Sequence, residues 1–285
     1  MITATFGYAA PESLADAVQL LGSDASTPLA GGMTLVADLE AGKARSRAVV
    51  DLRKIAQLRE IEHHADGSVR IGAMVTIADL AAEHGIPPAL AAAARAVPDP
   101  QVRYRATVGG NLATADRGAD LPPVLLALGA TVNLRAGDRV LAVPATAYLL
   151  GRPAGLITSV DVPGTGPGED CVAERVSDRP ARPPRLVVAV WARLEGDGRL
   201  GACRIAAAVT PGVPRRLPAV EAALTGTRLE PPQVVATCRN ISAADIGADG
   251  LAPGAGGTQP SGDYLRHRAS LLVARAFQRI GQGLS

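Results

Sequence analysis

The stretch Ala96–Ala130, AVPDPQVRYRATVGGNLATADRGADLPPVLLALGA, decides the fold of this 285-residue chain. It places the double glycine Gly109-Gly110 and Asn111 in a segment rich in turn-forming residues, and an apolar helical pattern follows from Pro122. Glycine lets a backbone approach a ligand closely because it has no Cβ. Successive N–H groups in such a turn form a concavity that suits phosphate. Asn111 tolerates the left-handed conformation and offers a side-chain amide to the same ligand.

A second, shorter glycine stretch, Leu29-Ala30-Gly31-Gly32-Met33-Thr34-Leu35, lies about eighty residues earlier. A strand is expected over Thr27–Ala30 and a helix over Thr34–Ala41, so the glycines lie at a helix start. Anions are favoured there because unpaired N–H groups and the helix dipole point the same way. An ordinary tight turn is the alternative for this stretch taken alone, and its spacing is not the G-x-G-x-x-G of a Rossmann unit. Together, the two glycine stretches suggest a ligand with two phosphates.

The composition indicates a chain of about two domains with ample length for a core. Hydrophobic residues make up 47% and aromatic residues 2%, so the core is expected to consist of Ala, Val, Leu and Ile. Few aromatic rings leave little stacking capacity for single-stranded nucleic acid. The net charge is +2, from 29 basic and 27 acidic residues, and no basic run stands out. No nucleic-acid partner is therefore expected.

The cysteines and histidines show no metal or disulfide pattern. Cys171, Cys203 and Cys238 are isolated in the sequence, which fits a reducing cytoplasm and excludes an iron–sulfur cluster with its roughly four thiolates. The four histidines lack metal-ligand spacing, so no metal site is expected. The sequence begins without a signal-peptide pattern, and no apolar stretch reaches the ~18 residues of a membrane span. A cytoplasmic protein without a membrane span is expected.

Strand and helix patterns alternate along the chain in short elements, which predicts an α/β or α+β fold. Ser13 and Thr76 begin helices with capping sequences, whereas Asp66-Gly67 and Gly137-Asp138 are turn dipeptides typical of hairpins. The segment Pro163–Asp170, PGTGPGED, is a linker by composition.

The two glycine stretches AGGMTL (30–35) and RATVGGNLATADRGADLPPVLLALGA (105–130), together with Ile71–Thr76 and Ser261–Tyr264, resemble the FAD-binding subunit of the molybdenum hydroxylases. That family includes the medium subunit of aerobic carbon monoxide dehydrogenase and the flavin domain of xanthine dehydrogenase. The resemblance runs through most of the chain and implies an α+β fold. It implies a two-part FAD-binding domain of the PCMH/VAO-like type over residues 1–165, with subdomains at about 1–55 and 56–165. A smaller α+β C-terminal domain of the carbon monoxide dehydrogenase flavoprotein type, an antiparallel sheet with helices, is expected over residues 171–285.

The resemblance implies FAD as the cofactor and two walls of residues that hold it. The first wall is formed by Ala30, Gly31, Gly32, Met33, Thr34 and Leu35, and the second by Thr107, Gly109, Gly110, Asn111, Thr114 and Asp120. Asp120 matches an Asp beside the ribityl or ribose hydroxyls, although capping of the helix that follows is an alternative role. Leu156 and Ile157 match positions near the isoalloxazine ring, with plain strand residues as the alternative.

The sequence departs from the family at the start of the C-terminal domain. Several members have an aromatic residue and then a basic one there, which cover the face and edge of the flavin. The corresponding segment here is Val172-Ala173-Glu174-Arg175, so Ala173 stands where the aromatic residue is expected. Arg175 is the candidate cation at the N1–O2 edge, where a positive charge would stabilise reduced anionic flavin. A solvated surface arginine is the alternative.

The resemblance implies an FAD-dependent oxidoreductase, a dehydrogenase subunit that passes electrons between iron–sulfur and molybdopterin partner subunits and NAD or another acceptor. Its own task would be to hold and tune the flavin, because the cofactor carries the redox chemistry. One alternative is a stand-alone FAD-dependent oxidase or dehydrogenase acting on a small organic substrate, suggested by the missing aromatic residue. A second alternative is a non-catalytic subunit that keeps the fold, against which the intact glycine stretches count.

Overall fold

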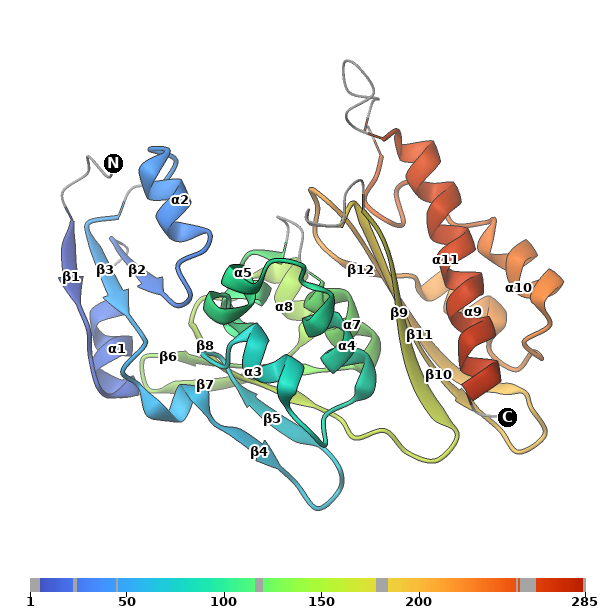
Figure 1. The fold of residues 1–285 in the computed structure, drawn as a ribbon, viewed down its shortest axis with the longest axis horizontal. Helices are drawn as coiled ribbons and strands as arrows, with labels where there is room; N and C mark the ends of the chain where they lie inside the picture. Colours follow the sequence, from blue (N-terminus) through green and yellow to red (C-terminus); the bar gives the residue numbers. More distant parts are fainter. Residues whose placement is uncertain are drawn as a thin grey trace.

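The computed structural model describes residues 6–22, 25–44, 46–115, 120–177, 184–249, 251 and 260–283 of the chain. Within these residues, three β-sheets follow one another along the sequence, and helices lie between them and on their faces (Figure 1). The described residues begin in the sheet at one end of the molecule and finish in the helix that covers the sheet at the other end.

The first sheet is parallel, with the strand order β1-β3-β2. Parallel strands need crossover connections, and α1 and α2 provide them. Helix α1 begins as predicted, because Ser13 Oγ accepts a hydrogen bond from the Asp16 N–H at 3.1 Å. The bounds are β1 Gly7–Ala9, α1 Leu14–Leu21, β2 Ser26–Leu29, α2 Leu35–Glu40 and β3 Ala48–Asp51.

The second sheet is antiparallel, with the order β4-β5-β8-β6-β7. Both predicted hairpins are present, as the pairs β4–β5 and β6–β7. The strands are β4 Ile61–His63, β5 Val69–Gly72, β6 Thr131–Ala136, β7 Arg139–Pro144 and β8 Leu156–Val162. The helical elements around them are η1 Ala56–Arg59, α3 Ile77–Ala82, α4 Pro88–Ala96, α5 Pro100–Arg105, α6 Val108–Ala113, α7 Leu121–Leu128 and α8 Ala145–Gly151.

The segment between α4 and residue 115 differs from the turn-rich loop that the sequence predicts. It forms the two short helices α5 and α6, and Gly109 and Gly110 lie inside the second. Thr107 begins α6, because its Oγ1 accepts the Gly110 N–H at 3.1 Å. Glycine is a poor helix former, so two glycines in a helix of six residues gave no helical signal. A side-chain cap compensates for that weakness.

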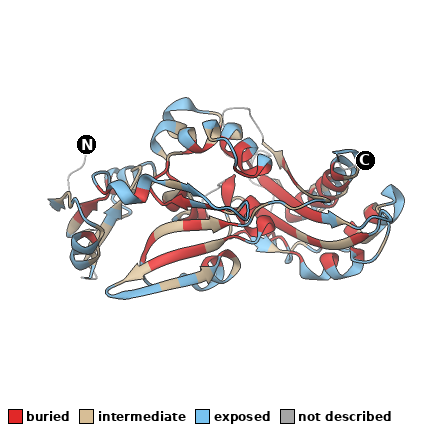
Figure 2. Ribbon diagram, turned by 90° about the horizontal axis from the view of Figure 1, so that it is seen from below, coloured by how far each residue is buried: buried red, intermediate tan, exposed pale blue. Residues whose placement is uncertain are grey.

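The third sheet is antiparallel, with the order β12-β11-β10-β9. Its alternate residues belong to two different cores. Cys171, Ala189 and Trp191 pack into the core that contains α7, whereas Val188 and Val190 pack with α11. Figure 2 shows the buried positions running along the strands and the helices that face them. The bounds are β9 Glu169–Val176, β10 Leu186–Leu194, β11 Leu200–Val209, β12 Arg215–Arg216, α9 Pro218–Leu224, α10 Pro231–Cys238 and α11 Gly262–Gly283.

Helix α7 joins the second and third sheets. Each residue from Leu121 to Leu128 is buried, which a surface helix would not show. At its C-terminal end, Arg204 of β11 donates from Nε to the Ala127 carbonyl at 2.6 Å and from an Nη atom to the Leu128 carbonyl at 3.2 Å. The guanidinium carbon also lies 3.6 Å from the ring centroid of Trp191 on β10. Arg204 therefore satisfies carbonyls left free at a helix end and stacks on an aromatic face.

We expect Arg204→Ala to lower the free energy of unfolding by about 2 kcal/mol, since it removes charge-assisted hydrogen bonds and a cation–π contact. Urea unfolding followed by the emission of Trp191, the single tryptophan of the sequence, measures this. Arg193→Ala is the matched control, because Arg193 forms an exposed pair with Glu195 at 3.7 Å and is expected to change stability by less than ~0.5 kcal/mol. Equal effects of the two substitutions would contradict the role given to Arg204.

The predicted α+β fold is confirmed: an N-terminal part with two sheets is followed by an antiparallel sheet with helices. The division at residues 165 and 171 and the subdomain boundary near residue 55 stay predictions. In the described part of the chain, no helix has the length and apolar character needed to cross a membrane.

Candidate functional site

The first glycine stretch connects the end of β2 to α2 and leaves a row of backbone amides that have no acceptor in the part of the chain that the structure describes. Gly32 has φ +78°, a conformation that side chains rarely adopt, so glycine is needed there. Its carbonyl accepts the Val36 N–H at 3.0 Å, which starts the turn into α2. Among the described residues, no hydrogen bond takes the amides of Gly31, Gly32, Met33 or Thr34.

The second glycine stretch has its amides occupied, in contrast to the sequence interpretation. The Gly109 N–H donates to Ala73 O at 2.9 Å, the Gly110 N–H to Thr107 Oγ1 at 3.1 Å, and the Asn111 N–H to Thr107 O at 2.8 Å. These donors form the start of a helix and its contact with the end of β5. The interpretation of Gly109-Gly110 as a second set of free amides is therefore wrong.

Close packing between chain segments explains two of the glycines. A Cβ on Gly109 would lie 2.8 Å from the Cβ of Ala73. A Cβ on Gly31 would lie 1.9 Å from the carbonyl oxygen of Arg105, so the two glycine stretches meet backbone to backbone at this point. Gly31 thus allows the two walls to approach each other, and Gly109 allows α6 to pack against Ala73. Both tasks differ from admitting a ligand.

Asn111 supplies an unpaired polar atom to the same region. Its Oδ1 is buried and has no hydrogen-bond partner among the described residues. A buried polar atom without a partner is costly, so it requires a partner from whatever fills the space beside it. Since the O and N atoms of a side-chain amide are assigned from their hydrogen bonds, the same position can offer either an acceptor or two donors.

A cleft lies between the two glycine stretches, made of two cavities that adjoin because they share Pro28, Ala30, Gly110 and Ala113. All the predicted cofactor residues line it except Asp120. One cavity contacts Ala30, Gly31, Gly32, Met33, Thr34, Leu35, Thr107, Gly110, Asn111 and Thr114, and the other contacts Ala30, Gly109, Gly110, Leu156 and Ile157.

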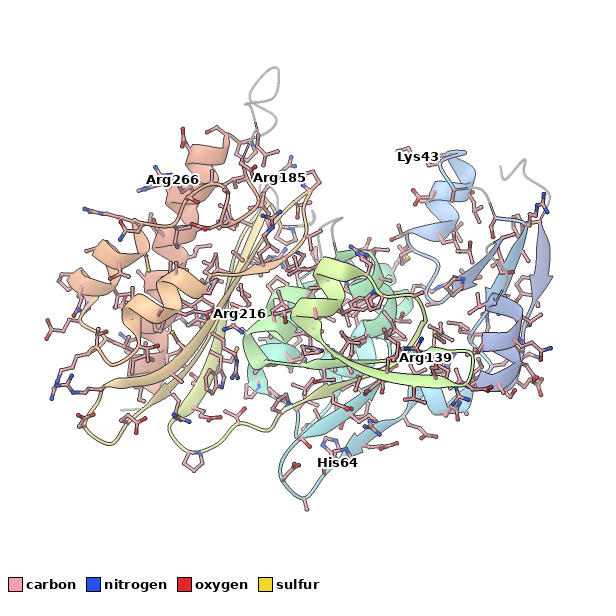
Figure 3. The ribbon with its side chains drawn as sticks, turned by 180° about the vertical axis from the view of Figure 1, so that it is seen from behind. Lys43, His64, Arg139, Arg185, Arg216 and Arg266 are labelled. Carbon is pink, nitrogen blue, oxygen red and sulfur yellow. The ribbon has the colours of Figure 1, made fainter. Side chains whose placement is uncertain are left out.

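The two ends of the cleft differ in chemistry. The end at the first glycine stretch offers backbone amides and the side chains of Thr34, Thr107 and Asn111. The other end is lined mainly by apolar groups, among them Leu156 and Ile157 at the start of β8. Of the described residues that line the polar end, none is a lysine, and Figure 3 shows Lys43 at the outer tip of α2. The cleft thus suits an elongated molecule with an anionic part and a flat apolar part.

Asp120 lies outside the cleft lining and does not cap α7. Its side chain makes no capping hydrogen bond, although the residue precedes the helix directly. It is 6% exposed, and its Oδ1 is 3.5 Å from an Nη atom of Arg175. Burial raises the pKa of the Asp120 carboxyl to about 6, and the positive charge of Arg175 opposes part of that rise.

Arg175 is neither a freely solvated arginine nor part of the cleft lining. Besides pairing with Asp120, it donates to the Ala96 carbonyl at the end of α4 and to Ser177 Oγ at 3.1 Å. Arg175 therefore ties β9 of the third sheet to the helices around the second. The proposed contact with a flavin edge stays a prediction.

Ala173 also lies away from the cleft. It pairs with Ala189 in the antiparallel register of β9 and β10 and packs against the central core. Because neither cavity is lined by this residue, the expectation that Ala173 stands in for an aromatic cover of the flavin is not supported by its position.

Some lining residues were not predicted from the sequence. They are mainly apolar positions from separated segments, and only the folded contacts bring them together: Pro28, Leu52, Ala73, Met74, Val102, Ala106, Ala113, Tyr148 and Gly155. Among the residues that the structure describes, no group of three or more His, Cys, Asp or Glu could hold a metal ion.

The cleft between the small parallel sheet and the antiparallel one suits a flavin nucleotide, which joins an anionic diphosphate to a flat ring system. Residues 4–165 match the family model described as FAD binding domain in molybdopterin dehydrogenase, which covers more than half of the chain. The chain belongs to this family, its cofactor is FAD, and its class is FAD-dependent oxidoreductase. The free amides of residues 31–34 and the unpaired Asn111 atom fit that cofactor.

The relatives place it among the medium subunits of this family. The chain is 31% identical to the carbon monoxide dehydrogenase medium chain of Afipia carboxidovorans over 291 residues, which cover 97% of this chain and 99% of that one. It is 32% identical to the nicotine 6-hydroxylase medium subunit of Paenarthrobacter nicotinovorans, with 86% of each chain covered. A solved carbon monoxide dehydrogenase of Hydrogenophaga pseudoflava matches with a TM-score of 0.87 and 30% identity, covering 100% of this chain and 99% of that one.

The raised pKa of Asp120 predicts a pH-dependent stability. A carboxyl whose folded pKa lies above its unfolded value stabilises the fold fully below the unfolded pKa and loses that contribution as the pH rises through the folded pKa. Relative to Asp120→Asn, we expect the free energy of unfolding of the FAD-free wild type to fall by roughly 3 kcal/mol between about pH 3 and about pH 7. Denaturant titrations of both proteins across this range measure the difference. A difference that does not change with pH would contradict the burial of this carboxyl.

The contact at Gly31 predicts a second result. Gly31→Ala would force a methyl group onto the Arg105 carbonyl, so the two walls must separate. We expect FAD affinity to fall by roughly 5- to 150-fold, since overpacking against backbone costs on the order of 1–3 kcal/mol. Flavin fluorescence quenching titrations measure the affinity, and circular dichroism checks the fold. Gly281→Ala is the control, because a Cβ at Gly281 in α11 meets nothing within 4 Å. Unchanged affinity in Gly31→Ala would show that the walls need not touch.

Proposed function

We propose that this chain is the FAD-carrying subunit of a molybdenum hydroxylase complex and passes electrons from iron–sulfur and molybdopterin partner subunits through FAD to NAD or another acceptor. The observation that carries the proposal is the row of unpaired amides from Gly31 to Thr34, which faces a cleft with an apolar far end. The medium-subunit relatives support the partner assignment, because this chain covers nearly the whole of one of them.

The residues of the cleft have distinct tasks in this proposal. The amides of Gly31, Gly32, Met33 and Thr34 hold the diphosphate by hydrogen bonds, which are strengthened when the acceptor carries charge. Asn111 meets the same polar part of FAD with its side-chain amide, whose Oδ1 has no other partner among the described residues. The apolar end, which includes Leu156 and Ile157, excludes water from the ring system. Bound FAD supplies the electron-transfer chemistry, and the protein supplies binding and orientation.

The remaining assignments extend the same proposal. The cofactor contacts are assigned to Ala30, Gly31, Gly32, Met33, Thr34, Leu35, Thr107, Gly109, Gly110, Asn111, Thr114, Leu156 and Ile157, and Asp120 is assigned an indirect role behind them. A cytoplasmic location is supported by three buried free cysteines, which suit a reducing compartment. The domain limits proposed are 1–165 and 171–285.

Purification of the chain alone tests the proposal. We expect a yellow protein with bound FAD that oxidises no organic substrate by itself, because the site that would accept such electrons lies in partner subunits. Absorbance at the flavin bands, with cofactor release and identification, measures the first part. Assays with candidate organic substrates measure the second part. Reduction of the bound FAD by NADH is followed beside them, because it is the proposed electron transfer to NAD run in reverse.

The other outcomes separate the alternatives. Turnover of an organic substrate by the isolated chain would make it a stand-alone oxidase or dehydrogenase. A colourless protein that takes up no added FAD would leave a non-catalytic subunit with the fold alone.

Thr34→Val is a comparison variant that keeps the loop amides and the shape of the side chain, so FAD binding is expected to persist in it.

A further inference from the structure

Arg105 connects the two glycine stretches from behind the cleft. It is the last residue of α5, two positions before the Thr107 that begins α6. Its Nε and an Nη atom both lie 3.3 Å from the carbonyl oxygen of Gly31 and donate to it. Arg105 does not line either cavity, whereas Gly31 lines the polar one, so the guanidinium holds the outer side of the loop.

The direction of the Gly31 carbonyl fixes the direction of the next amide. In a trans peptide unit the C=O and N–H bonds point in opposite directions and lie in one plane. A guanidinium that holds the Gly31 carbonyl on one side therefore aims the Gly32 N–H toward the opposite side, where the cleft lies. Gly32 has φ +78° and no side chain, so nothing else in this residue restricts the rotation of that peptide plane.

The charge of Arg105 adds to this orientation. Within the described part of the chain, no carboxylate pairs with Arg105, and its bonds to Gly31 are the ones that the guanidinium makes. A charged donor on a carbonyl polarises the peptide unit, which makes the N–H of the same unit a stronger donor. An unneutralised cation next to the loop also favours a ligand with two negative charges.

We propose that Arg105 is the positioning residue of the site: by holding the Gly31 carbonyl, it presents the Gly32 amide to the diphosphate of the bound cofactor. This inference rests on the proposed function, since it assigns a residue to the same site. Arg105 acts through the peptide group between Gly31 and Gly32 and makes no contact of its own with the reacting ring.

The test compares Arg105→Gln and Arg105→Lys in the full-length chain. We expect Arg105→Gln to weaken FAD binding by about 10-fold. The glutamine side chain is neutral and cannot donate two hydrogen bonds to the Gly31 carbonyl as the guanidinium does. Arg105→Lys restores the charge without the fork and is expected to recover part of the loss. ADP, which has the diphosphate but no flavin, should lose affinity by a similar factor in a competition titration. The ³¹P resonances of bound FAD should shift in Arg105→Gln, while its visible absorption bands stay in place.

Arg95→Gln is the matched control. Arg95 also lies in the last turn of a short helix, is exposed, and donates from a guanidinium to a backbone carbonyl, that of Ala81 at 2.9 Å. It is expected to leave FAD affinity and the ³¹P spectrum unchanged.

Three outcomes decide the matter. Loss of FAD and ADP affinity with displaced ³¹P signals supports the inference. A wild-type protein that binds FAD, together with an Arg105→Gln variant of equal affinity and identical ³¹P signals, overturns the inference and leaves the proposed function intact. A wild-type protein that binds no FAD overturns the proposed function itself.

Discussion

The structure depends on the contact between Gly31 and the backbone of Arg105. At this point the loop after β2 and the end of helix α5 approach so closely that a Cβ would overlap a carbonyl oxygen. Only glycine permits the approach, and the approach forms the cleft, since one wall follows β2 and the other precedes α6. The sheets behind these walls hold the contact in place. The position of the glycine is therefore a requirement of protein packing first and of ligand binding second.

Helix α7 extends this arrangement to the rest of the molecule. Its residues are buried on every side, and it packs against the third sheet and lies in the same stretch of sequence as Gly109-Gly110. At one end of the helix, Arg204 of β11 donates to the Ala127 carbonyl. At the other end, Arg175 of β9 pairs with Asp120. Both arginines belong to the C-terminal sheet. The C-terminal region is thus attached at both ends of the helix that leads out of the cofactor site. A change in this attachment therefore acts on the cleft through α7.

Much of the fold could be predicted because short sequence patterns, such as helix caps and turn dipeptides, indicated it. Ser13 and Thr76 capped their helices as expected, and the turns at Asp66-Gly67 and Gly137-Asp138 produced the expected hairpins. The glycine stretches identified the cleft from their similarity to a known family. Predictions failed where the outcome depended on contacts between segments. The amides of Gly109-Gly110 are taken by Ala73 and Thr107, Asp120 turns toward Arg175 instead of its own helix, and Ala173 packs against the core. No local pattern encodes those partners, and none marked Arg105.

The three buried cysteines have a practical consequence for work on the assembly. Burial raises the pKa of Cys171 and Cys238 to about 12 and that of Cys203 to about 11. Thiolates are the species that react with alkylating reagents, so these side chains stay inert while the chain is folded. A cysteine introduced on the surface would then be the one site that takes up a spin label or a dye. Distances between subunits could be measured on the native sequence background, with no need to replace cysteines that belong to the core.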